Sequence, residues 1–467
     1  MKRIAIIGGG ISGLSAAYSL EKQKRNGAQL EYVLFEAGPR FGGVLHTERI
    51  NDFVIEAGPD SFLTEKSWAT DLCRELGLGD QLITSNDSER RTYIFVRGRL
   101  VPLPEGLTLM VPTDLAATFF SPLFSWSTKL RILREWFYRP APNARESTVA
   151  EFVARHYGRE MVERVADPLL AGVYGGSADE LSVNAVLPRF AEIEARQGSL
   201  GRAMLASRKL QTTKRPIFTS LKNGMQSLAE ALLAHIPETS RRANSHVESV
   251  KPESGKWLIV SGERTTEFDA LVVAAPAHSA ATLLNESIPQ LASELEQINY
   301  SSSITVALAY NEAAGVSLPP GFGFLVPRSE RKRVLACTFV HQKFVHRAPQ
   351  GSALVRCFLG GSQDQEIATL SDQQIERILY RELQEILGVT NQPLFAKVYR
   401  WPKAMAQYTV GHKSRVERIR QITSALPGLA LAGNAYNGIG IPDCLRSGAE
   451  AAAKISADLG IAPSPSR

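Results

Sequence analysis

The spacing of hydrophobic residues near the start of the chain predicts a strand, a helix and a second strand. Arg3–Ile7 and Tyr32–Phe35 are short, nearly unbroken apolar runs, which is typical of strands that are buried on both faces. The stretch between them is long enough for one helix. Parallel strands that are joined by a helix form a βαβ unit.

The pattern changes several times along the rest of the chain. After residue 86 the sequence becomes largely helical and rich in aromatic residues, whereas residues 302–359 contain the apolar runs of a mixed sheet. The C-terminal part returns to a strand, a glycine-rich turn and a helix. Strands are expected at Thr92–Val96, around Val247, and at Trp257–Val260 and Ala270–Ala274, and helices at Gln226–Ile236, Asp372–Leu387 and Leu445–Leu459.

We therefore predict an α/β chain, α+β overall, whose Rossmann-like nucleotide-binding domain is interrupted twice. Residues 1–85, 211–285 and 416–467 form this domain in three parts. Residues 86–210 form an inserted helical domain, and residues 286–415 form a mixed-sheet substrate domain. A chain of 467 residues, 44% of them apolar, can bury two or three cores of this kind.

Cysteine usage and the start of the chain favour a reducing compartment. Cys73, Cys337, Cys357 and Cys444 are scattered without CxxC spacing, so we expect free structural thiols and neither a disulfide framework nor a metal site. Because the sequence starts directly with a core strand, no cleaved leader is expected ahead of it. The expected location is the cytoplasm.

The net charge of +6 is concentrated in one segment between residues 196 and 222, where no acidic residue occurs. No base-stacking platform or recognition helix accompanies these charges, so nucleic acid is excluded as a partner. A solvated loop and a surface that faces anionic lipid or an acidic substrate both stay open. The basic residues are Arg196, Arg202, Arg208, Lys209, Lys214, Arg215 and Lys222.

A glycine motif follows the first strand directly. Gly8, Gly10 and Gly13 have the G-x-G-x-x-G spacing, and Glu36 ends the second strand. The first glycine permits a tight turn, the second lets backbone approach a pyrophosphate, and the third lets helix and strand pack closely. The helix N-terminus favours the phosphates, and an acid in the position of Glu36 accepts hydrogen bonds from a ribose. This order of elements predicts a bound adenine dinucleotide.

A second glycine-rich stretch narrows the choice of dinucleotide. Residues 36–43 have the pattern E-x-x-x-R-x-G-G, which is similar to that of the flavoprotein family of amine oxidases, carotenoid desaturases and porphyrinogen oxidases. This resemblance implies FAD as cofactor. It also implies that Arg40 and Gly43 lie along the pyrophosphate, that the Gly58-Pro59 turn lies near the flavin ring, and that Val247 contacts the adenine.

The C-terminal sequence supplies the other side of the same cofactor site. Leu429–Ala432 is a strand that enters a glycine turn, and the helix that follows would point its N-terminal amides at the pyrimidine end of the flavin. Asp443 and Tyr408 are interpreted as structural residues near the flavin. The residues expected to bind FAD are Gly8, Gly9, Gly10, Ile11, Ser12, Gly13, Glu36, Ala37, Arg40, Gly43, Val44, Gly58, Pro59, Asp60, Ser61, Val247, Trp401, Gly433, Ile439, Gly440 and Ile441.

Blocks in the middle of the chain resemble the protoporphyrinogen and coproporphyrinogen oxidases of haem synthesis. The blocks occur in the order and at the spacing of that family, and amine oxidases and desaturases are not expected to contain them. The resemblance implies a porphyrinogen as substrate. The blocks are Asp167–Gly176, Asp179–Ser182, Gly321–Pro327, Phe358–Gly361 and Gln407–His412.

The resemblance also implies which residues bind the substrate. The backbone carbonyl of Gly172 would meet the pyrrole N–H groups at the centre of the macrocycle, since only backbone can reach the middle of so wide a ligand. Phe322 and Leu325 would enclose one pyrrole ring, and Phe358 would form a further apolar wall. Without the resemblance, these residues would be interpreted as a turn glycine and ordinary strand core.

One position departs from the family pattern and leaves carboxylate recognition open. Some members have an arginine on the strand before the Leu-Pro turn, where it pairs with a substrate propionate. That position is Thr92 here, with Arg91 beside it. Arg91 is the candidate partner, with Arg90 and Arg97 as alternatives, although alternation puts strand neighbours on opposite faces. The basic stretch 90–99 slightly favours coproporphyrinogen III, with four propionates, over protoporphyrinogen IX, with two.

The implied reaction is a six-electron oxidation. A meso carbon of the porphyrinogen gives a hydride to flavin N5 while a pyrrole N–H loses its proton. O₂ takes the electrons and forms H₂O₂, and three such cycles yield the porphyrin. No catalytic side chain is nominated, because the protein's part is to hold the edge of the macrocycle against the flavin in a dry cavity.

Membrane contact, assembly and rival functions stay open. Leu103–Trp126 is apolar and aromatic, but prolines and Asp114 interrupt it, so it predicts no spanning helix. It fits either a peripheral contact with the cytoplasmic membrane face or the mouth of a substrate channel. A homodimer and hand-over of the product to the next haem-pathway enzyme are open as well. The rival functions are an amine oxidase, a carotenoid desaturase and a non-catalytic flavin-bound porphyrin carrier.

Overall fold

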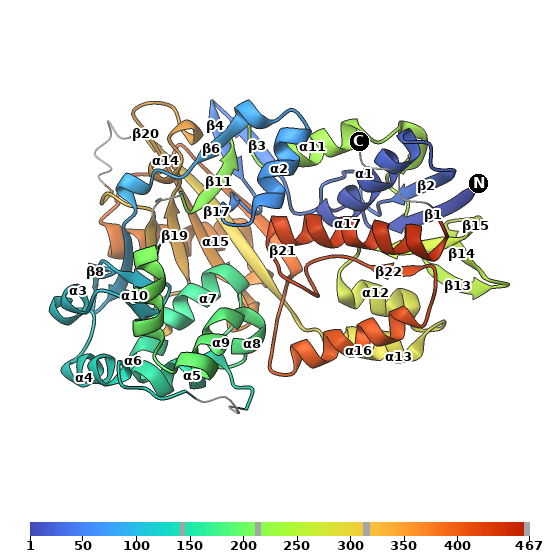
Figure 1. Ribbon diagram of the computed structural model, residues 1–467. Helices are drawn as coiled ribbons and strands as arrows, with labels where there is room; N and C mark the ends of the chain where they lie inside the picture. Colours follow the sequence, from blue (N-terminus) through green and yellow to red (C-terminus); the bar gives the residue numbers. More distant parts are fainter. Residues whose placement is uncertain (141–144, 211–215, 312–317, 462–467) are drawn as a thin grey trace.

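Two large β-sheets and one group of helices organise the chain in the computed structural model (Figure 1). The structure describes residues 1–140, 145–210, 216–311 and 318–461, and for residues 208–210 it describes the backbone only. One sheet has five parallel strands, and the other has seven strands of mixed direction. The predicted fold class is therefore confirmed. Lys214 and Arg215 of the basic run and the boundary at residue 211 lie outside the described residues.

The five-stranded sheet draws its strands from three distant parts of the chain. Side chains such as Ile4, Ile6 and Val272 are fully buried because they pack against helices on one face of the sheet. The opposite face packs largely against the antiparallel strands of residues 249–268. Helices α1 and α17 pack along each other on one face (Figure 1). In spatial order the strands are β12 (Arg241–Arg242), β2 (Leu30–Phe35), β1 (Lys2–Ile7), β16 (Ala270–Val273) and β22 (Leu429–Leu431), and the two helices are α1 (Ile11–Arg25) and α17 (Ile441–Asp458).

Two sequence expectations in this region were wrong. The last helix begins at Ile441 rather than Leu445, and Pro442 lies in its first turn, where the missing N–H removes no hydrogen bond. Val247 does not lie on a strand, because the chain between β12 and β13 (Ser249–Glu253) joins no ladder there. Val247 is nevertheless buried, which explains its apolar character.

The seven-stranded sheet buries one face under α15 (Asp372–Leu387), a helix found at its predicted position. Strand β7 also occupies its predicted residues, Thr92–Val96. Strands β7 and β18 pair in parallel and the other pairs are antiparallel. In spatial order the strands are β21 (Phe395–Ala406), β17 (Tyr300–Asn311), β20 (Ser352–Gly360), β19 (Ala336–Phe339), β18 (Gly323–Leu325), β7 and β8 (Arg99–Pro102).

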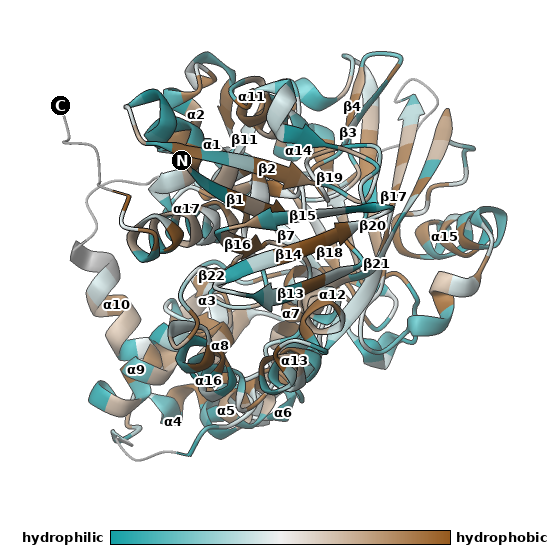
Figure 2. Cartoon of the chain, turned by 90° about the vertical axis from the view of Figure 1, so that its right-hand side faces the viewer, coloured by the Kyte–Doolittle hydropathy of each residue, from teal (hydrophilic) through white to brown (hydrophobic). Residues whose placement is uncertain are grey.

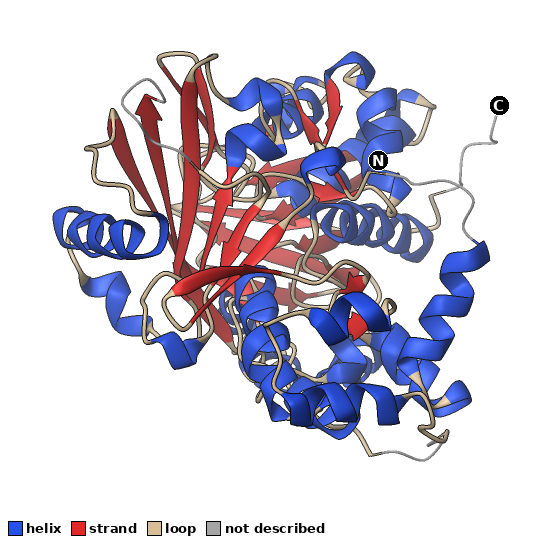
Figure 3. Ribbon diagram, turned by 90° about the vertical axis from the view of Figure 1, so that its left-hand side faces the viewer, coloured by secondary structure: helices blue, strands red, loops and turns tan. Residues whose placement is uncertain are grey.

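The helices between residues 115 and 210 lie together in the lower left of Figure 1, and Figure 3 shows a group of helices below the strands. Strands β7 and β8 belong to the seven-stranded sheet, although the expected division puts residues 86–210 in one insertion. The domain boundaries themselves stay a prediction. The helices are α3 (Leu115–Phe120), α4 (Trp126–Glu135), α5 (Val149–Tyr157), α6 (Arg159–Met161), α7 (Asp167–Tyr174), α8 (Val183–Val186), α9 (Pro188–Gln197) and α10 (Leu200–Leu210).

Many residues in the strands of the two large sheets are hydrophobic, as the brown segments in Figure 2 show. Smaller sheets and helices connect these parts. The small sheets consist of β3 (Thr47–Ile50) with β4 (Phe53–Glu56), β9 (Leu107–Thr108) with β10 (Val111–Pro112), β5 (Phe62–Leu63) and β6 (Leu82–Thr84) with β11 (Phe218–Leu221), and β13 with β14 (Lys256–Ser261) and β15 (Arg264–Phe268). The remaining α-helices are α2 (Ser67–Glu75), α11 (Gln226–Ala234), α12 (Ala277–Leu284), α13 (Pro289–Glu296), α14 (Val340–Lys343) and α16 (His412–Ser424).

A buried histidine joins four helices of the helical group. His156 on α5 lies with Nδ1 3.2 Å from Glu135 Oε1 of α4 and Nε2 3.2 Å from Glu194 Oε1 of α9. Glu135 also accepts a hydrogen bond of 2.6 Å from the Leu200 amide at the start of α10. Burial alone would lower the pKa of His156, but the hydrogen bonds to the two carboxylates raise it. Each ring nitrogen lies 3.2 Å from a carboxylate oxygen, which only accepts, so this geometry and the raised pKa favour an imidazolium that donates to both acids.

We expect His156→Leu to lower the stability of the fold by about 3 kcal/mol, because Glu135 would stay buried without a cation and Glu194 would keep only Arg155. The raised pKa also gives a pH dependence. The contribution of His156 is complete below its ordinary pKa of 6.5 and is lost as the pH rises through the raised value. Thermal unfolding followed from pH 6 to pH 9 should show a steeper loss of stability for the unmodified protein than for the variant.

The exposed His346 provides the control for this measurement. His346→Leu should unfold with the same pH dependence as the unmodified protein. Parallel pH curves for the His156 variant and the unmodified protein would contradict the imidazolium assignment.

Candidate functional site

The first glycine motif has the geometry that its spacing predicts. Gly8 has a φ of +108°, and a Cβ there would lie 2.7 Å from the Ala274 carbonyl oxygen. A Cβ on Gly13 would lie 1.8 Å from the Gly8 carbonyl oxygen, so α1 and β1 can pack only around a glycine. A Cβ on Gly10 would meet no atom within 4 Å. The motif therefore leaves an open space at the N-terminus of α1, where backbone amides favour a phosphate.

The second glycine stretch lies directly on the first. The Gly42 amide donates a hydrogen bond of 2.8 Å to the Gly9 carbonyl, and a Cβ on Gly43 would lie 3.1 Å from Gly10 Cα. The Arg40 guanidinium donates to the carbonyls of Gly43 and Leu45 at 2.5 and 2.9 Å. Arg40 thus fixes the loop that closes over the open space.

The carboxylate of Glu36 is held at the end of β2. It accepts hydrogen bonds of 2.8 Å from the amides of Gly9 and Gly38. The Ser245 amide donates to the Glu36 carbonyl at 2.8 Å, so the segment that leads to Val247 runs beside Glu36 and Ala37. The structure therefore brings Glu36 and the segment before Val247 together at one edge of the sheet.

The Gly58-Pro59 turn is held by side chains of the seven-stranded sheet. A Cβ on Gly58 would lie 1.9 Å from the Val44 carbonyl oxygen, so this turn packs against the second glycine stretch. The Ala57 carbonyl accepts hydrogen bonds from Thr305 Oγ1 at 2.6 Å and from Trp401 Nε1 at 2.8 Å. The structure thereby brings the predicted residue Trp401 to this turn. Thr305 was missed by sequence reasoning, because a threonine inside a strand carries no local signal.

Asp60 and Ser61 continue the same turn. Ser61 Oγ donates to Asp60 Oδ1 at 2.6 Å, and Lys343 Nζ of α14 donates to both carboxylate oxygens at 3.1 and 3.2 Å. Burial opposes ionisation of Asp60, but the charges of Lys343 and Arg356 lower its pKa below the ordinary range. Asp60 is therefore ionised and tied to the second sheet.

The C-terminal turn and α17 close the site from the other side. Gly433 follows β22 with a φ of +136°, and its amide donates to Ser447 Oγ at 3.1 Å. A Cβ on Gly448 would lie 2.1 Å from the Ser12 carbonyl oxygen, so α17 and α1 are in close contact. Helix α17 begins at Ile441, directly after the predicted Ile439 and Gly440. Because β1 and β22 are parallel, α1 and α17 direct their N-terminal amides to the same crevice.

Tyr408 and Asp443 have structural contacts, as interpreted from the sequence. Tyr408 Oη donates to the Asn434 carbonyl at 2.7 Å and accepts from the Gly438 amide at 2.8 Å. Asp443 pairs with Lys66 Nζ at 2.5 Å. Burial raises the pKa of Tyr408 well above its ordinary value. Both side chains therefore hold the C-terminal turn in place.

Three of the predicted substrate residues come together. Leu325 of β18 pairs with Ala336, which pairs with Phe358 of β20, and paired residues share one face of a sheet. This face lies opposite α15, because Cys357 and Leu359 point into the α15 core. Helix α7 lies in front of the face, and a Cβ on Gly172 would meet Leu325 Cδ2 at 3.8 Å.

Phe322 and Arg91 are neighbours, but the ladder does not bring Arg91 to this face. The Phe322 amide donates to the Arg91 carbonyl at 2.7 Å. Thr92 pairs with Gly323, and Ile94 pairs with Leu325, so Thr92 and not Arg91 shares the face of Leu325. Arg91 is exposed at the end of β7. A contact that sequence reasoning missed, Arg328 Nε to Asp167 Oδ2 at 2.9 Å, ties α7 to the segment after β18.

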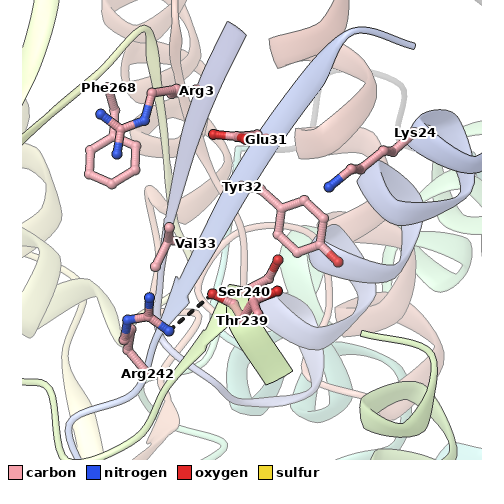
Figure 4. A pocket seen from close by; sticks show the side chains of 9 residues that line it. All are labelled: Arg3, Lys24, Glu31, Tyr32, Val33, Thr239, Ser240, Arg242 and Phe268. Carbon is pink, nitrogen blue, oxygen red and sulfur yellow. Dashed lines mark hydrogen bonds between the residues drawn. The ribbon is translucent and has the colours of Figure 1, made fainter. Parts of the chain in front are cut away.

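A pocket of about 250 Å³ lies away from all of these residues, around the first residues of β1 and β2 (Figure 4). Figure 4 shows Lys24 on one side of β2 and Arg3 and Phe268 on the other. The side chains that line the pocket therefore do not point towards one position where a ligand could bind. The pocket contains no residue predicted to bind cofactor or substrate. We therefore place the candidate site in the crevice at the carboxyl ends of the parallel strands.

The described residues include four cysteines and no cluster of metal-ligating side chains. All four cysteines are buried and free, as predicted. No group of three or more His, Cys, Asp or Glu side chains in residues 1–140, 145–210, 216–311 and 318–461 could hold a metal ion. Within the same ranges, every helix is too short or too polar to cross a bilayer.

The space around Gly10 and Gly13 predicts different effects for an alanine at each position. Gly10→Ala should leave the fold intact, because its methyl group meets no protein atom within 4 Å. It should lower the affinity for the dinucleotide by about tenfold or more, because the methyl group fills the open space. Gly13→Ala should destabilise the fold itself. Flavin content and the melting temperature of the apoprotein measure the two effects, and a normal flavin content in Gly10→Ala would contradict this placement.

Comparison with known proteins also identifies a flavoprotein family. The sequence pattern of the family described as "Flavin containing amine oxidoreductase" matches residues 11–456. A coproporphyrinogen III oxidase of Bacillus subtilis (strain 168) is 34% identical, with 96% of each chain covered. A second coproporphyrinogen III oxidase, from Staphylococcus aureus (strain NCTC 8325 / PS 47), is 30% identical over 98% of this chain and all of the relative.

A solved structure is similar over the whole chain. The crystal structure of a protein from Exiguobacterium sp. 255-15, named "Putative protoporphyrinogen oxidase", superposes with a TM-score of 0.86 at 31% identity. The match covers 98% of this chain and 99% of the other. The chain therefore belongs to the flavin-containing amine oxidoreductase family, and FAD, the predicted cofactor, is confirmed with it.

Proposed function

We propose that this protein oxidises coproporphyrinogen III to the porphyrin, with FAD as cofactor and O₂ as electron acceptor. One observation carries the proposal: Gly172 of α7 faces Leu325 on the sheet face that also holds Phe358 and the donors to the Ala57 carbonyl. A broad apolar wall thus lies next to the turn that is expected at the flavin ring.

The residues present fit FAD. Gly10 leaves space for a pyrophosphate at the N-terminus of α1, and Glu36 lies at the end of β2, where a ribose is expected. The Gly433 turn and the first residues of α17 would meet the flavin ring from the other side. When bound, FAD accepts a hydride from the substrate and returns the electrons to O₂.

The chain's own contribution is to bind and orient a wide, flat substrate. Leu325 and Phe358 offer hydrophobic surface to the face of a tetrapyrrole, which is where most of the binding energy is available. The backbone of Gly172 offers polar groups to the pyrrole nitrogens. No acid–base residue is assigned, since the proton leaves as the ring gains conjugation. Exclusion of water and alignment of the meso carbon are the expected catalytic contributions.

Basic residues at the ends of β7 favour the substrate with more carboxylates. Arg90, Arg91 and Arg97 form no ion pair with any described residue, and they lie at both ends of β7, the strand that pairs with β18. A substrate with four propionates gains more from such cations than one with two. Both relatives described above are named as coproporphyrinogen III oxidases, which supports the same choice.

The direct test offers each porphyrinogen separately to the purified yellow protein. The substrates are prepared without oxygen, air is admitted at time zero, and porphyrin fluorescence is followed above the rate of autoxidation. We expect coproporphyrinogen III to be oxidised faster than protoporphyrinogen IX, with H₂O₂ formed. A lack of acceleration with either substrate, from protein that holds FAD, would overturn the proposal.

Two neighbouring residues of β20 provide matched variants for this assay. Phe358→Ala removes apolar wall on the substrate side and should raise KM by about tenfold. Leu359→Ala removes a buried side chain on the α15 side, so it should lower stability but leave KM unchanged. Equal KM values for the two variants would contradict the assignment of this face to the substrate.

We also propose that the helical group makes a peripheral contact with an anionic membrane. Helix α4 exposes apolar side chains at helical spacing on its solvent side. This stripe continues just beyond the helix to Phe137, which is 82% exposed. Phe120 of α3, also 82% exposed, continues the stripe through Phe119, whose ring lies 5.4 Å from that of Trp126. The exposed residues of this α3–α4 patch are Leu109, Phe120, Trp126, Leu130, Leu133 and Phe137.

Basic residues border the α3–α4 patch. Lys129 lies over the rings of Phe119 and Trp126 at 5.7 and 5.0 Å, and Arg131 and Arg134 are exposed on α4. Arg202 of α10, part of the basic run, donates to the Trp136 carbonyl at the end of the same helix. An apolar stripe with a cationic border is the pattern of a helix that lies in a membrane interface.

The membrane proposal predicts binding to vesicles that contain phosphatidylglycerol. Cosedimentation with vesicles of equal parts phosphatidylglycerol and phosphatidylcholine should fall by about tenfold when Trp126, Leu130 and Phe137 are changed to Ser. Trp68, an exposed tryptophan of α2, provides the control, and Trp68→Ser should bind like the unmodified protein. Equal sedimentation of both variants, or none by the unmodified protein, would contradict the proposal.

A further inference from the structure

Five charged side chains form a buried cluster behind the Ala57–Asp60 turn. Lys343 pairs with Asp60 at 3.1 Å, Arg347 pairs with Glu56 at 3.0 Å, and Arg356 lies with Nη1 3.9 Å from Asp60. All five side chains are buried or nearly so, and Arg347 is completely inaccessible. Charges at such depth interact strongly because little water screens them.

The cluster contains three cations and only two carboxylates. Among the described residues, no sixth charged side chain forms an ion pair with any member. Arginine does not lose its proton in proteins, and Lys343 donates to both oxygens of Asp60. Burial raises the pKa of Glu56 and lowers that of Lys343, while the ion pairs with Arg347 and Asp60 oppose both shifts. With both ion pairs in their charged form the cluster has a net charge of +1, which is costly in the interior unless an anion lies close by.

Two further observations show that the described residues do not satisfy every hydrogen-bond donor of the two guanidinium groups. Nε and Nη1 of Arg347 and Nε of Arg356 are buried and have no hydrogen-bond partner. A cavity of about 10 Å³ has room for about one water molecule. It is lined by Arg347, Arg356, Glu56 and Asp60 together with apolar side chains such as Ile55 and Leu354.

Arg356 is the cation of the cluster that contacts the Gly58-Pro59 turn directly. Its Nη2 donates to the Gly58 carbonyl, and its guanidinium lies 4.7 Å from the ring centroid of Phe358. Arg356 and Phe358 are two residues apart on β20, so they share the face that is proposed for the substrate. The uncompensated charge thus lies between the proposed flavin turn and the proposed substrate wall.

We infer that the Lys343–Arg347–Arg356 cluster stabilises the reduced flavin and raises its reduction potential. This inference rests on the position of the Gly58-Pro59 turn beside the flavin ring, which is part of the proposed function. A hydride brings two electrons and one proton to the ring, so the reduced ring carries one more negative charge. That charge balances the +1 of the cluster, and the interior is neutral only when the flavin is reduced.

The test is the two-electron reduction potential of the holoenzyme, measured by dye equilibration without any porphyrinogen. Arg356→Met removes the excess charge, and we expect it to shift the reduction equilibrium at least about tenfold towards oxidised flavin, which is about 30 mV. Sulfite, an anion that adds to N5, should bind about tenfold more weakly. Arg356→Lys keeps the charge and should restore both values.

A charge-neutral change in the same cluster provides the control. Arg347→Met combined with Glu56→Gln removes one cation and one carboxylate, so the potential should stay that of the unmodified protein. Lys343→Met removes one cation at a second place and should shift the potential in the direction of Arg356→Met, which keeps the test valid if Arg356→Met does not fold. Unchanged potentials in both single variants, or an equal shift in the control, would overturn the inference. Failure of the porphyrinogen assay alone would leave these potentials, and the inference, unaffected.

Discussion

The hydrogen bonds from the seven-stranded sheet and α14 to the Ala57–Asp60 turn are the contact on which the rest of the site depends. Thr305 and Trp401 donate to the Ala57 carbonyl, Arg356 donates to Gly58, and Lys343 donates to Asp60. The turn itself packs on the second glycine stretch through Gly58. In the proposed function one sheet binds the dinucleotide and the other carries the substrate wall, so these bonds would set the distance between cofactor and substrate.

The side chains that contact the Ala57–Asp60 turn include buried charged groups. Burial alone would raise the pKa of Asp60, yet two cations keep the carboxylate ionised. A cluster of this kind is a poor way to stabilise a fold, because the cost of removing charges from water offsets their attraction. Its position next to the turn is therefore better explained by the electrostatics of the cofactor than by stability.

The helical group combines a rigid interior with an apolar exterior. His156 donates to Glu135 and Glu194, and Glu135 also accepts from the start of α10, so the helices are fixed by charge-assisted bonds. On the outside, the α3–α4 patch exposes aromatic and aliphatic side chains, which a protein surrounded only by water rarely presents together. This apolar face is the surface proposed for the membrane contact.

The sequence alone determined the features that depend on neighbours in the chain. The G-x-G-x-x-G spacing identified the turn at Gly8–Gly13, and hydrophobic periodicity located β7 and α15 at the residues where they occur. Only the tertiary structure decided which distant side chains meet. Thr305, Lys343 and Arg356 show no local signal, because their partners lie more than 200 residues away. Likewise, strand pairing decides that Thr92 rather than Arg91 shares the face of Leu325, since register is fixed by packing between strands and not by the strand itself.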